Sequence, residues 1–295
     1  MENNNEFKII NKLILAPNVK RLDILAETIS QKALPGQFVV VIPQEKARWV
    51  TLTIVEADKR RGIISLIFDE RDAEEKQLAA MHIEDELFSI MGPFGKPCFS
   101  KKVGHVICIA EGAHIADMLP ICKTLKNAGN KVVGIIGAAN KKALVFENQM
   151  RLFCHKLLIT TDDGSYVKKG DVIGSLKRML QEQEVKLVYA AGDVDTLKGI
   201  SQITKQKGIK TLVHFTSNIF CGKGTCGSCR MQVGGQMILA CQEGPEFDAS
   251  EIDFDILRTR LDALGKTENK EDKQLDKKID TETIVKKFFP GQFRS

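Results

Sequence analysis

The chain has 295 residues, of which 43% are hydrophobic and 27% charged, a composition typical of a globular protein with room for two domains and a small third one. It contains no apolar run long enough to cross a membrane, and its first residues, MENNNEFKII, lack the pattern of a signal peptide. The net charge of +5 is spread out and aromatic residues make up 6%, which gives little support to nucleic-acid binding. We therefore predict a cytoplasmic protein with no membrane span and no nucleic-acid partner.

Residues 1–100 are predicted to form an antiparallel β-barrel. The segments FKIINKLILA, QFVVVIP, WVTLTIVEA and GIISLIFDE are rich in Val, Ile, Leu and Phe. Turn signals such as Leu34-Pro35-Gly36 and Gly92-Pro93 separate them. Several short strands at this spacing favour an antiparallel sheet that closes into a barrel.

Residues 101–215 alternate between short apolar segments and helical patterns. The apolar segments are residues 105–110, 131–138, 155–161, 185–192 and 209–215, and the helical patterns are residues 118–129, 171–184 and 194–205. Strands that alternate with helices of about 10–15 residues indicate a parallel α/β sheet. The fold class is therefore α/β plus β, with a central α/β domain of the nucleotide-binding type after the barrel.

Two smaller segments complete the chain. Residues 216–260 hold clustered cysteines and several glycines, and we expect a small domain with little regular structure around a metal. Residues 261–295 are predicted to be a charged linker and tail: the charged stretch GKTENKEDKQLDKKID (265–280) has no apolar periodicity and predicts a solvated linker. The apolar end, residues 281–295, is either a partner-docking peptide or a frayed terminus.

Four of the eight cysteines have the spacing Cys221-x4-Cys226-x2-Cys229-x11-Cys241. This is the plant-type ligand pattern of a [2Fe–2S] cluster, in which four thiolates converge on two irons and small residues let the loop wrap closely. Zinc is the main rival, but structural zinc sites usually pair two C-x2-C knuckles and this segment has one. A segment without metal is the remaining alternative.

The segment CGKGTCGSCRMQVGGQMILACQEGPEFDASEIDF resembles the cluster domain of the iron–sulfur flavoprotein branch of the ferredoxin reductase superfamily. Similar groups are the small subunit of NADH-dependent ferredoxin:NADP oxidoreductase (sulfide dehydrogenase-type) and the electron-transfer subunit of class 1B dihydroorotate dehydrogenase. In the former an aspartate commonly stands where this chain has Cys221. The resemblance covers residues 7–260 and implies a flavin-binding barrel, a pyridine-nucleotide domain and a [2Fe–2S] domain, in that order.

The FAD site that the resemblance implies is altered. The candidate FAD contacts are Thr51, Leu52, Thr53 and Phe68. The arginine that usually precedes the flavin strand is missing, and Arg48, one residue away, would point to the opposite face of the strand. Residues 71–75 (RDAEE) stand where the family has glycine and threonine, and their carboxylates would repel a diphosphate.

The implied nucleotide site has changed in the same direction. The candidate nucleotide contacts are Gly112, Asp163 and Gly164. A glycine-rich turn at a helix N-terminus lets backbone N–H groups approach a phosphate, but residues 110–117 (AEGAHIAD) keep one glycine and add Glu111 and Asp117. We expect His114 in this turn to be a cap or a solvent-exposed side chain.

Together these features predict an electron-transfer subunit of a multi-subunit oxidoreductase. It would pass electrons through a [2Fe–2S] cluster to or from a larger flavoenzyme or iron–sulfur subunit. Nucleotide reduction is predicted to be impaired or lost and FAD binding is left open, so the chain is an oxidoreductase component, a relay without its own NAD(P)H site. The alternatives are a fully active FAD/[2Fe–2S] NAD(P)H–ferredoxin reductase-type subunit and a zinc-stabilised structural or interaction subunit.

Overall fold

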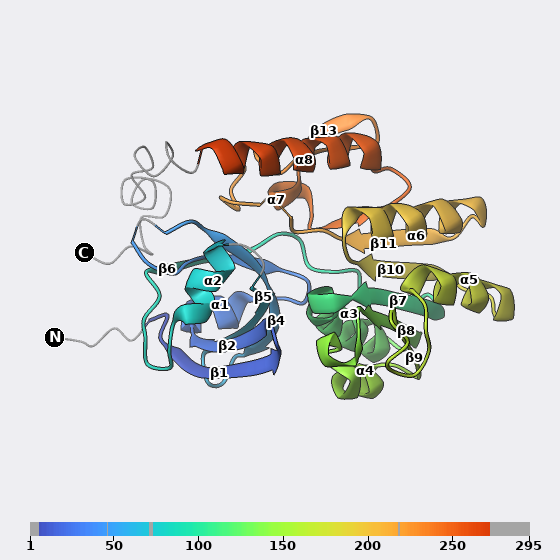
Figure 1. The fold of residues 1–295 in the computed structure, drawn as a ribbon, viewed down its shortest axis with the longest axis horizontal. Helices are drawn as coiled ribbons and strands as arrows, with labels where there is room; N and C mark the ends of the chain where they lie inside the picture. The colour runs from blue at the N-terminus through green and yellow to red at the C-terminus, as the bar shows by residue number, and fades with distance from the viewer. Residues whose placement is uncertain (1–5, 46, 71–72, 218, 272–295) are drawn as a thin grey trace.

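The computed structural model describes residues 6–45, 47–70, 73–217 and 219–271. They form two six-stranded sheets and a two-stranded hairpin. Figure 1 shows the antiparallel sheet in blue, the central sheet with its helices in green and yellow, and the C-terminal lobe in orange and red above them. The C-terminal lobe therefore lies over both larger parts.

The N-terminal sheet is antiparallel, as predicted, but it is not closed. Its strands are β1 (Ile9–Ala16), β2 (Val19–Leu25), β3 (Phe38–Ile42), β4 (Val50–Asp58), β5 (Ile63–Asp69) and β6 (Ser89–Phe94). Their order is β1-β2-β5-β4-β3-β6, so β1 and β6 are the two ends and the predicted closed barrel is wrong. The β1 side chain Lys12 donates to the carbonyls of Ala79 (2.5 Å) and Met81 (2.6 Å), which ties β1 to the β5–β6 connection instead.

Two short helices accompany this sheet, and the sequence patterns did not predict either. They are α1 (Glu27–Lys32) and α2 (Ala73–Ala80). Helix α1 buries Ile29 and α2 buries Leu78, and both side chains belong to the same hydrophobic core as the inward side chains of β2, β3 and β5. One apolar side chain per helix is too weak a periodic signal to identify such elements.

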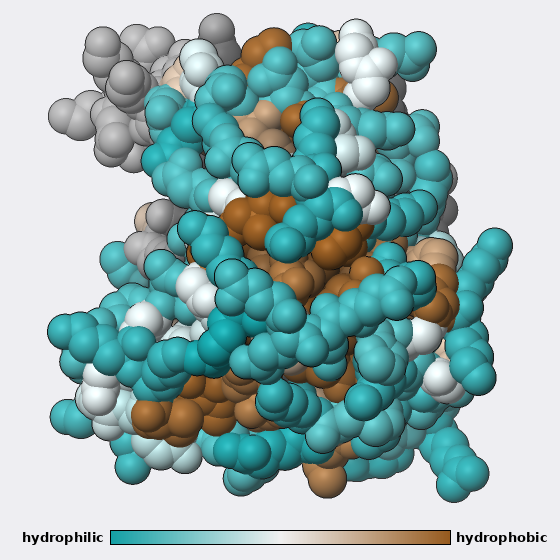
Figure 2. Space-filling model, turned by 90° about the vertical axis from the view of Figure 1, so that its right-hand side faces the viewer, coloured by the Kyte–Doolittle hydropathy of each residue, from teal (hydrophilic) through white to brown (hydrophobic). Residues whose placement is uncertain are grey.

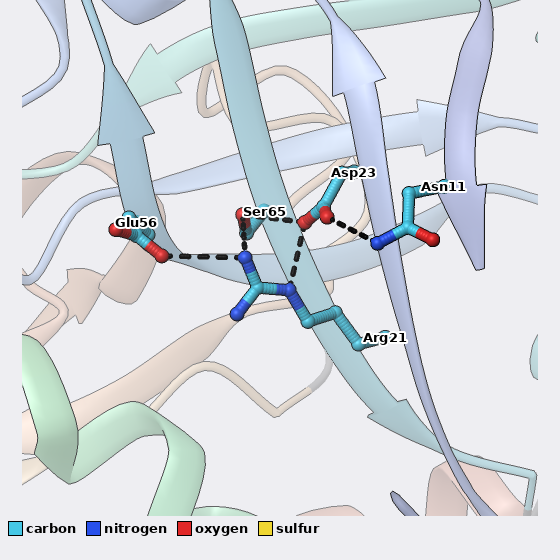
Figure 3. Close-up of polar contacts among 5 residues, drawn as sticks. All are labelled: Asn11, Arg21, Asp23, Glu56 and Ser65. Atoms are coloured by element: carbon cyan, nitrogen blue, oxygen red, sulfur yellow. Dashed lines mark hydrogen bonds and ion pairs between the residues drawn. The ribbon is translucent and has the colours of Figure 1, made fainter. Parts of the chain in front are cut away.

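A polar network lies on the face of this sheet opposite the core (Figure 3). The Asp23 carboxylate accepts hydrogen bonds from Arg21 Nε (2.7 Å), Ser65 Oγ (2.7 Å) and Asn11 Nδ2 (2.9 Å). Arg21 also pairs with Glu56 at 3.3 Å. Burial alone would raise the pKa of Asp23, but these donors outweigh it and lower that pKa. The network links β1, β2, β5 and β4 side by side.

The central sheet confirms the predicted parallel α/β arrangement. Its strands are β7 (His105–Glu111), β8 (Lys131–Ala138), β9 (Lys156–Thr161), β10 (Leu187–Ala191), β11 (Lys210–His214) and β14 (Glu246–Asp248), in the order β14-β11-β10-β7-β8-β9. Its helices are α3 (Ile115–Asn127), α4 (Glu147–Phe153), α5 (Val172–Glu182) and α6 (Val194–Gln206). Helices α5 and α6 cover one face, and α3 and α4 the other (Figure 1).

The C-terminal lobe is less separate than the sequence suggested. The hairpin of β12 (Arg230–Val233) and β13 (Gln236–Leu239) leads through α7 (Ala240–Glu243) into β14. Strand β14 pairs antiparallel with β11, so the GPEFD segment forms the edge of the central sheet. Helix α8 (Phe254–Glu271) follows and extends past residue 261. Residues 265–271 of the predicted linker continue this helix; the rest of the linker, with residues 281–295, lies outside the described part.

Few of the large apolar side chains are exposed on the described surface. On the face in Figure 2, hydrophilic side chains surround apolar ones that gather in the middle and along the lower edge. The large apolar side chains with the greatest exposure are Ile14 (72%), Val167 (69%) and Leu152 (67%), which come from β1, the loop after β9 and α4. Single exposed apolar side chains are common on folded proteins. Within the described residues, no helix has the length and apolar character needed to cross a membrane.

Candidate cluster site and nucleotide edge

The structure brings the four cysteines of the C-terminal lobe together. Cys221 Sγ and Cys226 Sγ lie 3.3 Å apart. The Cys241 thiol makes hydrogen bonds with the thiols of Cys221 and Cys229. Cys226 is exposed and the other three are buried. The four thiols thus form one continuous run of contacts, in which Cys221 lies between Cys226 and Cys241, and Cys241 lies between Cys221 and Cys229.

Backbone geometry explains why the ligand loop is rich in glycine. Gly222 has φ +67°, a region that side chains disfavour, and a Cβ there would lie 2.4 Å from Cδ2 of Phe94 at the end of β6. Gly227 has φ +71°, and a Cβ there would lie 3.0 Å from the Arg230 guanidinium. The β12–β13 hairpin then returns Cys241 beside Cys229. The loop can therefore pack against the antiparallel sheet only because these positions lack side chains.

Three side chains surround the thiols with hydrogen-bonding groups. Ser228 Oγ lies 3.1 Å from Cys226 Sγ, and Gln242 Nε2 donates to the Gly222 carbonyl at 3.0 Å. Arg260 on α8 donates from Nη2 to the Gly227 carbonyl at 3.1 Å. Its Nε is buried and has no hydrogen-bond partner in the described part of the chain. A buried, unpaired cationic donor on a side chain that contacts the ligand loop is suited to an anionic group.

These residues fit a [2Fe–2S] cluster. Four thiolates shared between two irons give two ligands to each, and the structure brings four thiols into mutual contact. Among the described residues, no group of three or more His, Cys, Asp or Glu side chains has an arrangement that could hold a metal ion as it stands. The ligand spacing, with one C-x2-C knuckle, is therefore what favours a two-iron centre over one tetrahedral zinc.

The candidate flavin residues lie on β4 and β5 and divide between the two faces of the antiparallel sheet. Leu52 and Phe68 are 7% and 3% exposed and belong to the core of the antiparallel sheet. Thr51 and Thr53 point the other way, toward the rest of the molecule. Thr51 Oγ1 donates to the carbonyl of Ile219, two residues before the first ligand, and Thr53 Oγ1 lies 3.2 Å from His214 Nε2. Both hydroxyls are therefore engaged by the protein.

The region expected to hold the FAD diphosphate is closed by an ion pair. Arg48 Nη1 lies 3.0 Å from Glu74 Oε1 in the first turn of α2. A guanidinium paired with a carboxylate is less available to a phosphate. Of the predicted pyrophosphate stretch, residues 71–72 lie outside the described part. Trp49 packs against the core shared by the central sheet and the C-terminal lobe, as a packing residue would.

Acidic and histidine side chains occupy the carboxyl edge of the central sheet, where dinucleotides bind in such folds. Glu111 ends β7 and accepts a hydrogen bond from Thr196 on α6. His114 Nδ1 lies 3.1 Å from Asp117 Oδ2, and its Nε2 lies 3.8 Å from Asp193 Oδ1. His114 stands at the expected N-cap position of α3, but its side chain makes no cap hydrogen bond and lies within ion-pair distance of Asp117 and Asp193 instead.

The pKa values of this edge follow from burial and pairing. Burial lowers the pKa of His114, but Asp117 and Asp193 outweigh it and raise that pKa to about 9. Burial raises the pKa of Asp117, but the bond to His114 brings it below its ordinary value. Burial is the main cause of the raised pKa of Glu111. His114 and Asp117 therefore form a charged pair at neutral pH.

The candidate nucleotide contacts lie along the same edge but apart. Gly112, with φ +57°, follows β7, whereas Asp163 and Gly164 follow β9, and β8 lies between these strands. The Asp163 carboxylate accepts from the backbone N–H of Ser165 at 2.9 Å, so it closes its own turn. The two turns predicted to contact a nucleotide therefore lie at this edge, with one strand between them.

Sequence reasoning missed His214 and Arg260. His214 is the last residue of β11, 3% exposed, with an unpartnered Nδ1 within the described residues. Its place at the carboxyl end of the last predicted parallel strand is the signal that could have marked it. Arg260 lies on the helix after the cluster lobe, and no local pattern connects it to the cysteines.

Comparisons with known proteins agree with this geometry. A family model, the iron-sulfur cluster binding domain of dihydroorotate dehydrogenase B, matches residues 217–253. An uncharacterized protein in the adh 3′ region of Clostridium beijerinckii is 34% identical over 271 residues, which cover 89% of this chain and 91% of that protein. The dihydroorotate dehydrogenase B (NAD(+)) electron transfer subunit homolog of Thermotoga maritima is 31% identical over 254 residues, which cover 86% of this chain and 90% of the homolog.

Solved structures point the same way. A chain of the NADH-dependent reduced ferredoxin-NADP oxidoreductase, studied for flavin-based electron bifurcation, matches with a TM-score of 0.84 and 28% identity over 97% of this chain and 100% of that one. The Plasmodium falciparum ferredoxin-NADP+ reductase shares only the fold, with 16% identity and a TM-score of 0.57 over 72% of this chain and 97% of the reductase. The resemblance expected from the cysteine segment is confirmed. The chain belongs to the family of dihydroorotate dehydrogenase B electron transfer subunits and their homologues.

Proposed function

We propose that this chain is an electron-transfer subunit that holds a [2Fe–2S] cluster on Cys221, Cys226, Cys229 and Cys241. The observation that carries the proposal is the mutual contact of four thiols in a segment with plant-type ligand spacing. When bound, such a cluster carries one electron at a time between a reduced donor and an oxidised acceptor. The names of the relatives, electron transfer subunits and a subunit of an oxidoreductase complex, support a multi-subunit assembly.

The second part of the proposal is that the chain does not reduce itself with NAD(P)H. Phosphates need backbone N–H groups and cations, but the carboxyl edge of the central sheet offers Glu111, Asp117 and Asp193. The cation nearest to these carboxylates, His114, is already paired with two of them. A dinucleotide would have to displace this ion-paired group, so the electron pair of a hydride donor is split in the partner.

A fully active FAD and NAD(P)H subunit is the second candidate. Two observations favour it: the Asp163–Ser165 turn keeps its place at the carboxyl edge, and β4 presents Thr51 and Thr53 on the face toward the cluster lobe. Against it stand the Arg48–Glu74 pair and the hydroxyls already bound by Ile219 and His214. The partner that we propose is therefore a larger flavoenzyme or iron–sulfur subunit, and a cytoplasmic location stays a prediction.

Cofactor analysis of anaerobically purified protein tests the proposal. We expect about two irons and two sulfides per chain, brown colour, and neither FAD nor bleaching by NADH or NADPH. Stoichiometric FAD with bleaching by NAD(P)H would establish the second candidate. Colourless protein that contains zinc and no sulfide would overturn the cluster assignment.

A further inference from the structure

Arg260 reaches the cluster loop from outside the cysteine segment. It lies on α8, and its Nη2 donates to the carbonyl of Gly227 at 3.1 Å. Gly227 directly follows the ligand Cys226 in the C-x2-C half of the loop. The side chain thus places a guanidinium against the ligand loop.

The guanidinium is not satisfied by this one contact. Arg260 is half-buried, and its Nε is buried without a hydrogen-bond partner among the described residues. A buried, unpartnered N–H of a permanent cation normally costs stability, unless it faces a negative charge. Arg258, two residues earlier on the same helix, differs: it pairs with Asp195 at 2.9 Å and Asp262 at 3.4 Å. Two arginines of one helix therefore have different surroundings.

A four-thiolate [2Fe–2S] centre is anionic and gains one more negative charge on reduction. A fixed positive charge close by stabilises the reduced form more than the oxidised form. Solvent exposure and hydrogen bonds set the reduction potential of such clusters. A half-buried guanidinium therefore changes that potential more than a solvated guanidinium does.

We propose that Arg260 is a positioning residue of the cluster: it anchors the Gly227 carbonyl, and its charge raises the reduction potential of the centre. This inference rests on the proposed [2Fe–2S] function. Arg230 stands on the other side of Gly227 but is exposed, so water screens its contribution more strongly. The chain thus tunes its cluster with a residue supplied by the helix that follows the cysteine segment.

Redox titration of the purified holoprotein, followed by visible absorption and by electron paramagnetic resonance, tests this inference. The variants are Arg260→Gln and Arg260→Met, which remove the charge, Arg260→Lys, which keeps it, and Arg258→Gln as the matched control. At a fixed solution potential, we expect about a threefold to tenfold smaller ratio of reduced to oxidised cluster in the neutral Arg260 variants, where tenfold corresponds to about 59 mV for one electron. Arg260→Lys and Arg258→Gln should stay near the wild-type potential.

Iron and sulfide contents, measured first, separate the proposed [2Fe–2S] function from the role of Arg260. A wild-type protein that contains neither iron nor sulfide refutes the proposed function itself. With clusters present, an unchanged potential in Arg260→Gln and Arg260→Met overturns the role of Arg260, and so does an equal shift in Arg258→Gln. If neither neutral variant keeps a cluster, Arg260→Lys decides. If Arg260→Lys retains the cluster at the wild-type potential, the role of the positive charge is supported. If Arg260→Lys loses the cluster, the shape of the guanidinium alone holds the loop and the role of the charge is overturned.

Discussion

The cluster lobe and the carboxyl edge of the central sheet belong to one fold but differ in what they retain. In the lobe, four thiols lie in mutual contact, Ser228 contacts the Cys226 thiol, and Gln242 and Arg260 donate to carbonyls of the ligand loop. At the edge, Glu111 and the His114–Asp117 pair occupy the turn expected to receive a phosphate. Both regions belong to the same fold. In the proposed function they differ because different side chains stand in their loops, so function depends on the loops at a site and not on the fold.

The largest effect should come from the ligands themselves. Cys229→Ala removes one thiolate of a contacting pair, and we expect the purified protein to lose nearly all iron, sulfide and visible absorption, because two irons cannot be held by three protein ligands in this loop. Iron and sulfide assays measure this. Cys98→Ala, which changes a buried cysteine outside the lobe, should keep a full cluster. Equal iron loss in both variants would contradict the ligand assignment.

Glu246 should rank next, because it joins the two regions. Its Oε2 accepts from the fully buried Tyr189 hydroxyl at 2.5 Å and from the Phe99 N–H at 2.7 Å. Glu246→Leu leaves both donors unpaired, and we expect a loss of about 3 kcal/mol in the free energy of unfolding by urea.

The matched control for this effect is Glu243→Gln. Glu243 is exposed and, among the described residues, pairs with Lys96 at 2.7 Å, so its replacement should change the free energy of unfolding by about 0.5 kcal/mol or less. A Glu246→Leu protein as stable as this control would show that β14 is not anchored through that carboxylate.

The ion pair at the carboxyl edge of the central sheet should make the free energy of unfolding depend on pH. The folded-state pKa of His114, about 9, lies above its ordinary value of 6.5 because of Asp117 and Asp193, after the opposing effect of burial. The pair therefore stabilises the fold fully below about pH 6.5, and this contribution is lost as the pH rises through 9. The free energy of unfolding should fall between these values in the wild type, and less so in His114→Gln.

His82, with 83% of its side chain exposed, offers the comparison: His82→Gln should keep the wild-type pH profile. If the free energy of unfolding of His114→Gln depends on pH between 6.5 and 9 as the wild type does, the His114–Asp117 pair does not stabilise the fold in the way described.

The smallest effect is expected for Thr51, whose hydroxyl ties β4 to the Ile219 carbonyl ahead of the first ligand. Thr51→Val keeps the shape and removes one hydrogen bond, which should cost about 1 kcal/mol and speed cluster loss to a chelator. The absorbance decay after chelator addition measures this. If Thr51→Val loses its cluster at the wild-type rate, the hydrogen bond from β4 does not stabilise the cluster lobe.

The parts that could be predicted depend on local pattern. The apolar run of β8 and the ligand spacing are local signals, and the structure reproduces the strand at Lys131–Ala138 and brings the four thiols together. Barrel closure was wrong, because pairing between β1 and β6 is a long-range property that short strand patterns do not encode. The placement of β14 beside β11 escaped for the same reason.

The remaining site features arise from contacts between distant segments. The Thr53–His214 contact joins residues 161 positions apart, and the Arg260–Gly227 bond joins residues 33 apart. Neither has a spacing rule that could be read along the chain. The charge of Asp117 could be read from the sequence, but its contact with His114 could not, so His114 was expected to be a cap or an exposed side chain.

One anaerobic titration tests the contrast between the two regions most directly. Holoprotein would be mixed with NADH, with NADPH and finally with dithionite, while the visible absorption of the cluster is followed. The account predicts that neither nucleotide changes the absorption and that dithionite bleaches it by one electron per chain. Bleaching by either nucleotide without an added partner would show that the carboxyl edge still accepts a dinucleotide and would contradict the account.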